Sequence, residues 1–302
     1  MRSGPVRSFW LSFLLTLAVV MPVMGAFALY VAAFPQTART EQIQSGVPVN
    51  RPTGKNALSI LAVSAGRQPA FVLVRLNATE ACFRMYVLPA ETVVLSGEGP
   101  CTLAQAYETA GPARAADLLA DTLQIPLEQY LAATPEVWAQ AAEEAGTARL
   151  NLDGLLDEEE RESLGLTEGV LTLNGEGAAQ LLDAAELAPV RLAGLRAGIW
   201  QAFARQNREN LGTAVSGVLR QNSGSLLTNL SGVDLYTLAD TLDYLAQAEP
   251  EAQLMPGVWE ERTGQYALNE ESVSLSQREF GAAAEQEDAA SGASAEAGSS
   301  VQ

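Results

Sequence analysis

Short apolar runs separated by turn residues dominate the chain after residue 55. Residues 56–65 (NALSILAVSA), 71–76 (FVLVRL) and 82–89 (CFRMYVLP) are rich in β-branched and aromatic residues, which is typical of strands. The connections between the three runs are brief. We therefore expect the runs to form neighbouring strands of a β-meander.

Beyond residue 101 the spacing of apolar residues lengthens to the 3.6-residue period of helices. Segment 102–124 predicts two helices separated by Gly111-Pro112. A short helix is predicted to begin at Pro135 and end at Gly146. The remaining pattern predicts helices at 175–187, 190–210 and 233–249, strands at 125–134 and 148–152, and two last strands within 252–269. Alternation of strands with helices predicts an α/β fold with a sheet covered by helices.

The N-terminal region carries an apolar stretch, residues 9–34, with no charged residue between Arg7 and Arg39. At ~1.5 Å per residue a helix of this length exceeds the ~30 Å hydrocarbon core, so the stretch predicts a transmembrane helix. Arg2 and Arg7 precede it and predict a cytoplasmic N-terminus with the rest of the chain extracytoplasmic. The alternative is a cleaved signal peptide, because residues 26–28 (Ala-Phe-Ala) resemble a cleavage site.

The predicted organisation has five parts. Residues 1–8 form a cytoplasmic N-terminus, 9–34 the membrane helix and 35–55 a polar stalk. Residues 56–280 form the extracytoplasmic domain. The tail 281–302 is rich in Ala, Gly, Ser and Glu, which predicts disorder because it has almost nothing to bury.

Charge and composition restrict the function. The chain has 18 basic and 36 acidic residues, a net charge of −18, and this repels nucleic acid. It contains no histidine, which excludes Ser-His-Asp catalysis and argues against a metal site. Outside the cell a disulfide between Cys82 and Cys101 is expected to persist; two buried thiols are the alternative. The acidic run 157–162 predicts a solvated loop or helix start.

Four stretches, taken in order, resemble the LytR-CpsA-Psr family of membrane-anchored cell-envelope ligases. They are RQPAFVLVRLN (67–77), FRMYVLPAETVV (83–94), residues 104–134 (AQAYETAG to QYLAAT) and VLTLNGEGAAQLL (170–182). The likeness covers roughly residues 56–280. It implies a three-layer α/β/α domain with a mixed central sheet that binds a polyprenyl-pyrophosphate-linked glycopolymer and transfers it to peptidoglycan. In the family, arginines hold the pyrophosphate and acidic residues hold Mg²⁺ or assist proton transfer.

Most of the charged positions of the family are replaced in this chain. Where the family has aspartates there are Ser64 and Pro69, and the family's PRDT loop reads Pro89-Ala90-Glu91-Thr92. The remaining family arginines and acids fall on Asp183, Ala185, Ala188, Gly194 and Leu195. By resemblance, Arg67 and Arg191 are the pyrophosphate-binding residues that survive. Arg196, reached by a two-residue shift of the alignment, and Glu91 are alternatives.

Three hypotheses follow from these replacements. The first is a non-catalytic envelope protein, acting as a regulator, a scaffold or a binder of polyprenyl-pyrophosphate lipids, because losing several charged groups removes most transition-state stabilisation. It needs no cofactor and no catalytic residue. The second is an active ligase that uses Mg²⁺ and a relocated set of Arg67, Arg75, Arg84, Glu91, Arg191 and Arg196. The third is an unrelated exported domain. Trp138, Trp200 and Trp259 are expected to be core residues, with lining of a lipid groove as the alternative.

Overall fold

The computed structural model describes residues 51–97, 99–184 and 186–281. The chain divides into two units, Met1–Arg51 and Pro52–Gln302, and the fold described here belongs to the second. The predicted membrane helix 9–34, most of the stalk and the tail from residue 282 lie outside the described residues. Within the described ranges, no helix has both the length and the apolar composition that crossing a bilayer requires.

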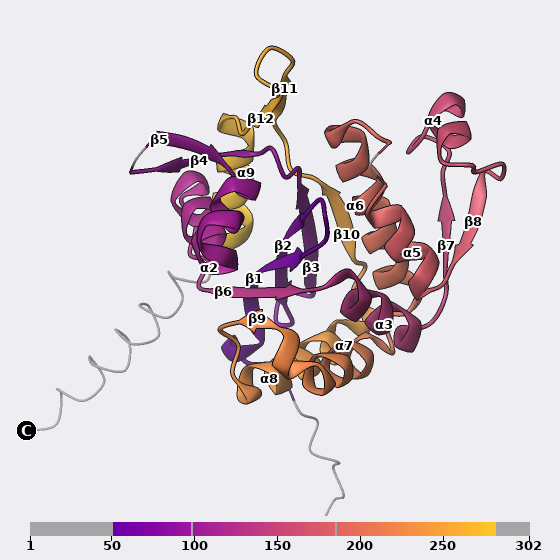
Figure 1. Ribbon diagram of the computed structural model, residues 1–302. Helices are drawn as coiled ribbons and strands as arrows, with labels where there is room; N and C mark the ends of the chain where they lie inside the picture. The colour runs from indigo at the N-terminus through magenta and orange to yellow at the C-terminus, as the bar shows by residue number, and fades with distance from the viewer. Residues whose placement is uncertain (1–50, 98, 185, 282–302) are drawn as a thin grey trace, which may run out of the picture. The chain divides into compact units, whose positions relative to one another are not determined.

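A six-stranded sheet forms the centre of the domain (Figure 1). Its strands, in spatial order, are β10 (Glu251–Leu254), β3 (Cys82–Leu88), β2 (Ala70–Asn77), β1 (Ala57–Ser64), β6 (Gln129–Ala133) and β9 (Leu227–Thr228). The pairs β1–β2, β2–β3 and β6–β9 are antiparallel, and β1–β6 and β10–β3 are parallel. The predicted meander and the mixed sheet are confirmed.

The directions of these strands gather several loops at one end of the sheet. Strands β1, β3, β6 and β10 all point the same way, so their carboxyl ends meet at a single edge. The loop after β1 joins the end of β6 through a hydrogen bond in which Ala65 N donates to Ala133 O at 2.8 Å. Loops 65–69 and 89–92 are thereby brought to the same place.

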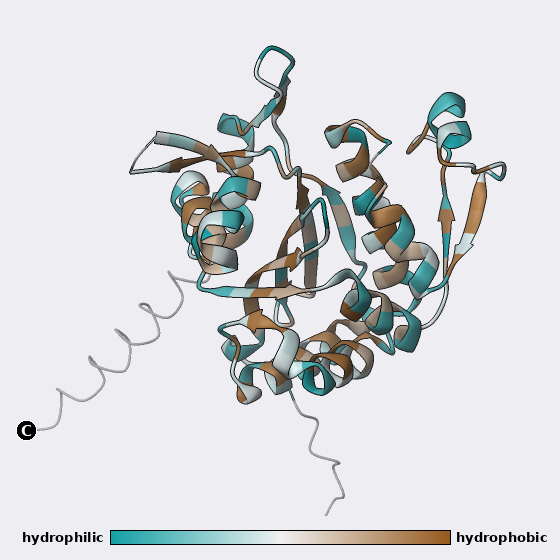
Figure 2. Ribbon diagram, in the orientation of Figure 1, coloured by the Kyte–Doolittle hydropathy of each residue, from teal (hydrophilic) through white to brown (hydrophobic). Residues whose placement is uncertain are grey.

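Helices cover both faces of the sheet, and alternate strand residues feed two separate cores. On one face lie α2 (Leu103–Leu123) and α9 (Glu270–Phe280), against a core that includes Phe71 and Leu73. On the other face lie α3 (Pro135–Ala145), α6 (Pro189–Gln206), α7 (Leu211–Gln221) and α8 (Gly232–Tyr244), against a core that includes Val72 and Leu76. The central strands are accordingly hydrophobic along most of their length (Figure 2).

A third cluster lies beside this sheet and fixes the position of α6. It joins the hairpin of β7 (Ala148–Asn151) and β8 (Val170–Leu173) to α5 (Gly175–Leu182) and α6, and α4 (Glu158–Ser163) lies in the connection between the two strands. Its buried members include Leu150, Leu173, Leu181 and Leu195. The hairpin and α5 thus hold α6 from the side that faces away from the sheet.

Local signals explain several boundaries. Helix α2 is continuous except at Ala110 and Gly111, where Gly111 adopts φ 75°, so the two predicted helices exist and meet at a kink before Pro112. Helix α3 begins at Pro135 and ends at Gly146, whose φ is 130°, as predicted. The acidic run forms the start of α4, capped by Asp157, as expected of a solvated helix start.

Other elements differ from the sequence-based expectation. The sequence pattern predicts neither the hairpin of β4 (Val93–Ser96) with β5 (Gly99–Thr102) nor the helices α7 and α9, whereas the hairpin of β11 (Val258–Glu260) with β12 (Gln265–Ala267) supplies the two strands expected within 252–269. The region 252–269 contributes to three strands where two were expected, because β10 joins the central sheet separately. No hydrophobic periodicity predicts α9, because most of its residues are polar. Phe280 at its end is nevertheless fully buried.

Candidate functional site

An apolar cavity of about 140 Å³ lies between one face of the sheet and the helices that cover it. The strands line it with branched and aromatic side chains. Helix α3 lines it with four alanines, and small side chains leave space that larger ones would fill. Its walls include Ala62, Val72, Met85, Ala141, Leu182 and Phe203. A closed apolar space of this kind suits an aliphatic chain.

Two tryptophans form part of the cavity wall. The rings of Trp138 and Trp200 pack edge to face, with centroids 5.5 Å apart and planes at 84°. Trp138 Nε1 donates to Val63 O at 3.1 Å, which fixes its ring against β1. Both residues belong to the core as expected, and both also line the cavity. Trp259 lies instead on β11.

A buried arginine lies behind one wall of the cavity. The side chain of Leu182 lines the cavity, and its carbonyl accepts a hydrogen bond from Arg196 Nε at 2.9 Å. Arg196 Nη2 donates to Gln68 O at 3.0 Å, so one guanidinium ties α6 to the end of α5 and to the β1–β2 loop. Arg196 is 2% exposed, and burial lowers its pKa to about 10 although nearby carboxylates oppose the shift. It therefore stays charged at neutral pH.

Three further charged residues surround Arg196. Arg67 Nε lies 3.4 Å from Asp183 Oδ2, with side-chain exposures of 87% and 28%. Asp183 and Glu91 both stabilise the charged form of Arg196 through their own charges. We call these four residues, Arg67, Glu91, Asp183 and Arg196, the charged cluster. It combines the ion pair of Arg67 with Asp183 and a buried arginine whose charge is favoured by Asp183 and Glu91.

The loop after β3 carries Glu91 into this cluster. Thr92 Oγ1 donates to Pro89 O at 2.7 Å and closes a turn. Ala104 N donates to Ala90 O at 2.9 Å, and Tyr266 N donates to Glu91 O at 3.1 Å. The loop backbone is thus held by α2 and β12, which restricts where the Glu91 side chain can reach.

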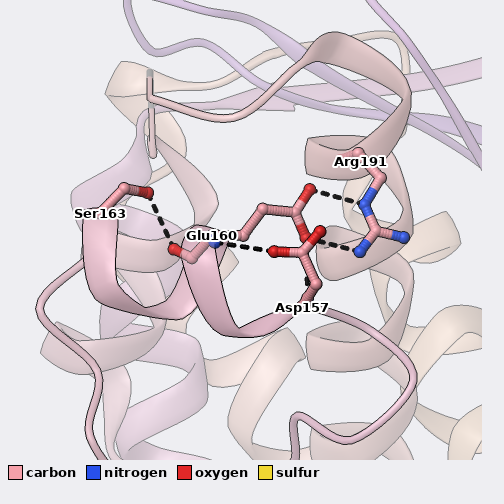
Figure 3. Close-up of polar contacts among 4 residues, drawn as sticks. All are labelled: Asp157, Glu160, Ser163 and Arg191. Atoms are coloured by element: carbon pink, nitrogen blue, oxygen red, sulfur yellow. Dashed lines mark hydrogen bonds and ion pairs between the residues drawn. The ribbon is translucent and has the colours of Figure 1, made fainter.

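Arg191 does not join the cluster. Its Nε and Nη2 bind Glu160 Oε1 and Oε2 at 2.7 and 2.5 Å, a bidentate ion pair between α6 and α4 (Figure 3). Asp157 Oδ1 accepts a hydrogen bond from Glu160 N at 2.9 Å and so fixes the start of α4. The joint role of Arg67 and Arg191 in binding a pyrophosphate stays a prediction. In the structure Arg67 contacts Asp183 and Arg191 contacts Glu160, whereas Arg196, the alternative, binds the carbonyl of Gln68, next to Arg67 in the chain.

The Glu160–Arg191 pair has a measurable consequence for stability at low pH. The hydrogen bonds from Arg191 lower the pKa of Glu160 to about 2. Because this pKa lies below the unfolded value of ~4.3, the pair stabilises the fold above that value and loses its effect as the pH falls towards 2. Between pH 6 and pH 2.5, we expect the urea midpoint of unfolding to fall less in Glu160→Gln than in wild type. The matched control is Glu159→Gln, an exposed neighbour, which should leave the decline unchanged; equal slopes for wild type and Glu160→Gln would refute the assignment.

Two arginines of the relocated ligase set lie on the opposite face of the sheet. Arg75 and Arg84 occupy paired positions on β2 and β3, and they face the same side as Leu73 and Tyr86. Arg75 is 2% exposed and donates to Ser59 Oγ, and Arg84 pairs with Glu251 at 2.5 Å. The sheet separates them from the cavity, so the structure does not assemble that set.

The two cysteines are free thiols, which corrects the predicted disulfide. Cys82 begins β3, whereas Cys101 lies on β5, in the hairpin beyond the other end of β3. Seven residues of strand span ~20 Å, and a disulfide needs Cα atoms within ~7 Å. Partial burial raises the pKa of the Cys82 thiol.

An open groove of about 1000 Å³ runs along the outer side of α5 and shares Ala179 with the cavity. Its walls come from the β1–β2 loop, the start of α3, the end of α4 and the strand β8. Arg67 is the one basic residue among its described lining residues, and its acids are Glu136, Glu176, Asp183 and Glu186. Over residues 51–97, 99–184 and 186–281, no three acidic or cysteine side chains converge in a way that could hold a metal ion.

Some partners at this site have no signal in the sequence. Gln68 and Leu182 act through their backbone carbonyls, which residue identity does not reveal. The sequence predicts that Glu160 lies in a solvated loop or helix start, and nothing in a single sequence pairs it with Arg191. Asp183 was recognised as a replacement for a family arginine, but its bond with Arg67 depends on α5 ending beside the β1–β2 loop.

The domain has relatives of known structure. Lin1025 from Listeria innocua aligns with a TM-score of 0.53 at 17% identity, covering 76% of this chain and 98% of that one. TagV from Bacillus subtilis gives a TM-score of 0.58 at 16% identity, covering 76% and 97%, and TagT bound to LIIa-WTA gives 0.58 at 19% identity, covering 81% and 98%. No protein-family profile and no curated protein matches the sequence. At these identities the likeness shows the fold alone, and at that level the LytR-CpsA-Psr-like fold that the sequence resemblance implies is confirmed.

Proposed function

We propose that this protein is a membrane-anchored, extracytoplasmic component of bacterial envelope glycopolymer assembly that binds the chain of a prenyl lipid and does not transfer a glycan. Related folds give the setting, since TagT has been solved bound to LIIa-WTA. The apolar N-terminal stretch 9–34 would supply the anchor.

The observation that carries the proposal is an apolar cavity that adjoins a charged groove. Leu182 lines the cavity and binds the buried Arg196 with its carbonyl, and Ala179 lines both the cavity and the groove whose walls carry Arg67 and Asp183. A lipid with a long aliphatic tail and a polar head matches both surfaces. With the side chains as they stand in the structure, the cavity of about 140 Å³ holds part of such a tail.

We propose that no glycan is transferred because the guanidinium groups near the cavity already bind acceptors within the protein. Arg196 is engaged by two backbone carbonyls, Arg191 by Glu160 and Arg67 by Asp183. Stabilising a diphosphate leaving group requires donors aimed at the developing charge, and these donors already have acceptors. The purified full chain, given Mg²⁺, a prenyl-diphosphate-linked glycan and peptidoglycan, should show no glycan transfer. Transfer that disappears in Arg67→Ala would favour the ligase hypothesis instead.

Filling the cavity should abolish lipid binding. Ala179→Phe places a ring where α5 borders the cavity, and we expect the bound fraction of geranylgeraniol to fall at least about 10-fold in native mass spectrometry of the full chain. The control Ala110→Phe adds the same ring at an exposed position on α2, across the sheet, and should bind as wild type does. Thermal unfolding of each variant shows that it is folded. Undiminished binding by a folded Ala179→Phe protein would place the lipid elsewhere.

A further inference from the structure

We propose that Asp183 makes this site select against diphosphate head groups, so that the cavity takes a prenyl lipid whose head is uncharged. The inference rests on the proposed function and deepens it by assigning the class of head group. Asp183 is the residue that determines this specificity.

The first support is that the two arginines nearest the cavity and its adjoining groove already have partners within the protein. Arg67 Nε lies 3.4 Å from Asp183 Oδ2. Arg196 is buried and holds two carbonyl oxygens, which leaves it unable to move towards a ligand. A diphosphate would have to displace Asp183 from Arg67 and would then lie beside the freed carboxylate.

The second support is the orientation of α5. This helix ends at Leu182, and Asp183 is its C-cap, so the negative end of the helix dipole and the carboxylate lie at the same point. Anions bind at the opposite, amino-terminal ends of helices. The carboxyl end of α5 therefore adds to the repulsion of a phosphate.

The third support is the charge of the adjoining groove. Its described walls contain Glu136, Glu176 and Glu186 in addition to Asp183, against Arg67 alone. A head group leaving the cavity along α5 enters this acidic surface. By contrast, a hydroxyl head can donate to Asp183 and accept from Arg67 without breaking their ion pair.

The test compares two lipids that share one tail. The full chain is titrated with geranylgeraniol and with geranylgeranyl diphosphate, and binding is followed by the fluorescence of the cavity tryptophans, Trp138 and Trp200. Wild type should bind the alcohol more tightly than the diphosphate. Asp183→Asn should raise the affinity for the diphosphate about 10-fold and leave the affinity for the alcohol within about 2-fold.

The matched control is Asp153→Asn, which removes the same charge from an exposed ion pair with Arg161 outside the walls of the cavity and groove. It should leave both affinities unchanged. Tighter binding of the diphosphate by wild type, or an equal gain in Asp183→Asn and Asp153→Asn, would overturn the role of Asp183 while leaving the lipid-binding proposal in place. Failure of both lipids to bind would overturn the proposed function and this inference with it.

Discussion

Arg196→Met is expected to lower the free energy of unfolding by about 3 kcal/mol, because it leaves two buried carbonyl oxygens without donors. Methionine preserves much of the apolar stem, so the effect isolates the guanidinium. Urea denaturation followed by circular dichroism measures the change. The loss should be accompanied by loosening of the β1–β2 loop, since Gln68 O is one of the two acceptors.

Arg205→Met is the matched control on the same helix. Arg205 is 61% exposed and pairs with Glu249 at the surface, and such pairs contribute ~0–1 kcal/mol. If Arg196→Met cost no more than Arg205→Met, the carbonyls of Leu182 and Gln68 would have to find other donors, and Arg196 would not be the link between α5, α6 and the loop.

Phe280→Ala is expected to cost about 3–5 kcal/mol, the range for deleting a fully buried ring. Phe280 is the last residue of α9, and its ring centroid lies 6.0 Å from that of Tyr86 on β3. Burial, the largest cause, raises the pKa of Tyr86 to about 12, so admitting water should also lower that pKa. Urea denaturation gives the first quantity and ultraviolet titration of tyrosine the second.

Tyr236→Ala serves as the control, since this aromatic residue on α8 is 63% exposed. Its removal should cost less than about 1 kcal/mol, mostly from its contact with Arg220. Similar losses for Phe280→Ala and Tyr236→Ala would mean that α9 does not complete the core against β3.

The sheet could be predicted because its strands are buried on both faces. Strands β1, β2 and β3 read as mostly apolar runs rich in branched and aromatic residues, and such runs identify a strand without knowledge of its neighbours. Strand β9 has two residues, and its pairing with β6 depends on where α7 ends, which no local pattern records. Helix α9 presents few apolar residues, so its burial is a tertiary effect.

The site was predictable to a lesser extent. The loop carrying Glu91 and the presence of Arg67 followed from the family resemblance. The acid that Arg191 contacts could not be predicted, because positions on a helix say which residues share a face, but not which acid meets them from another element. Glu160 lies 31 positions before Arg191, and only the packing of α4 on α6 joins them. The cavity likewise depends on small residues from several helices facing one side of the sheet.

The closing of the sheet by late elements has a consequence for biogenesis. Strand β3 ends at Leu88. The strand beside it, β10, ends at Leu254, and α9, whose Phe280 packs on Tyr86 of β3, ends at Phe280. At the usual rate of synthesis, β3 is therefore made roughly 10–40 s before β10 and α9 are complete. Through that interval it exposes an unpaired edge, which is the state most prone to aggregation. A chain stopped before β10 would keep that edge unpaired, and a chain stopped before Phe280 would lack the ring that packs against Tyr86.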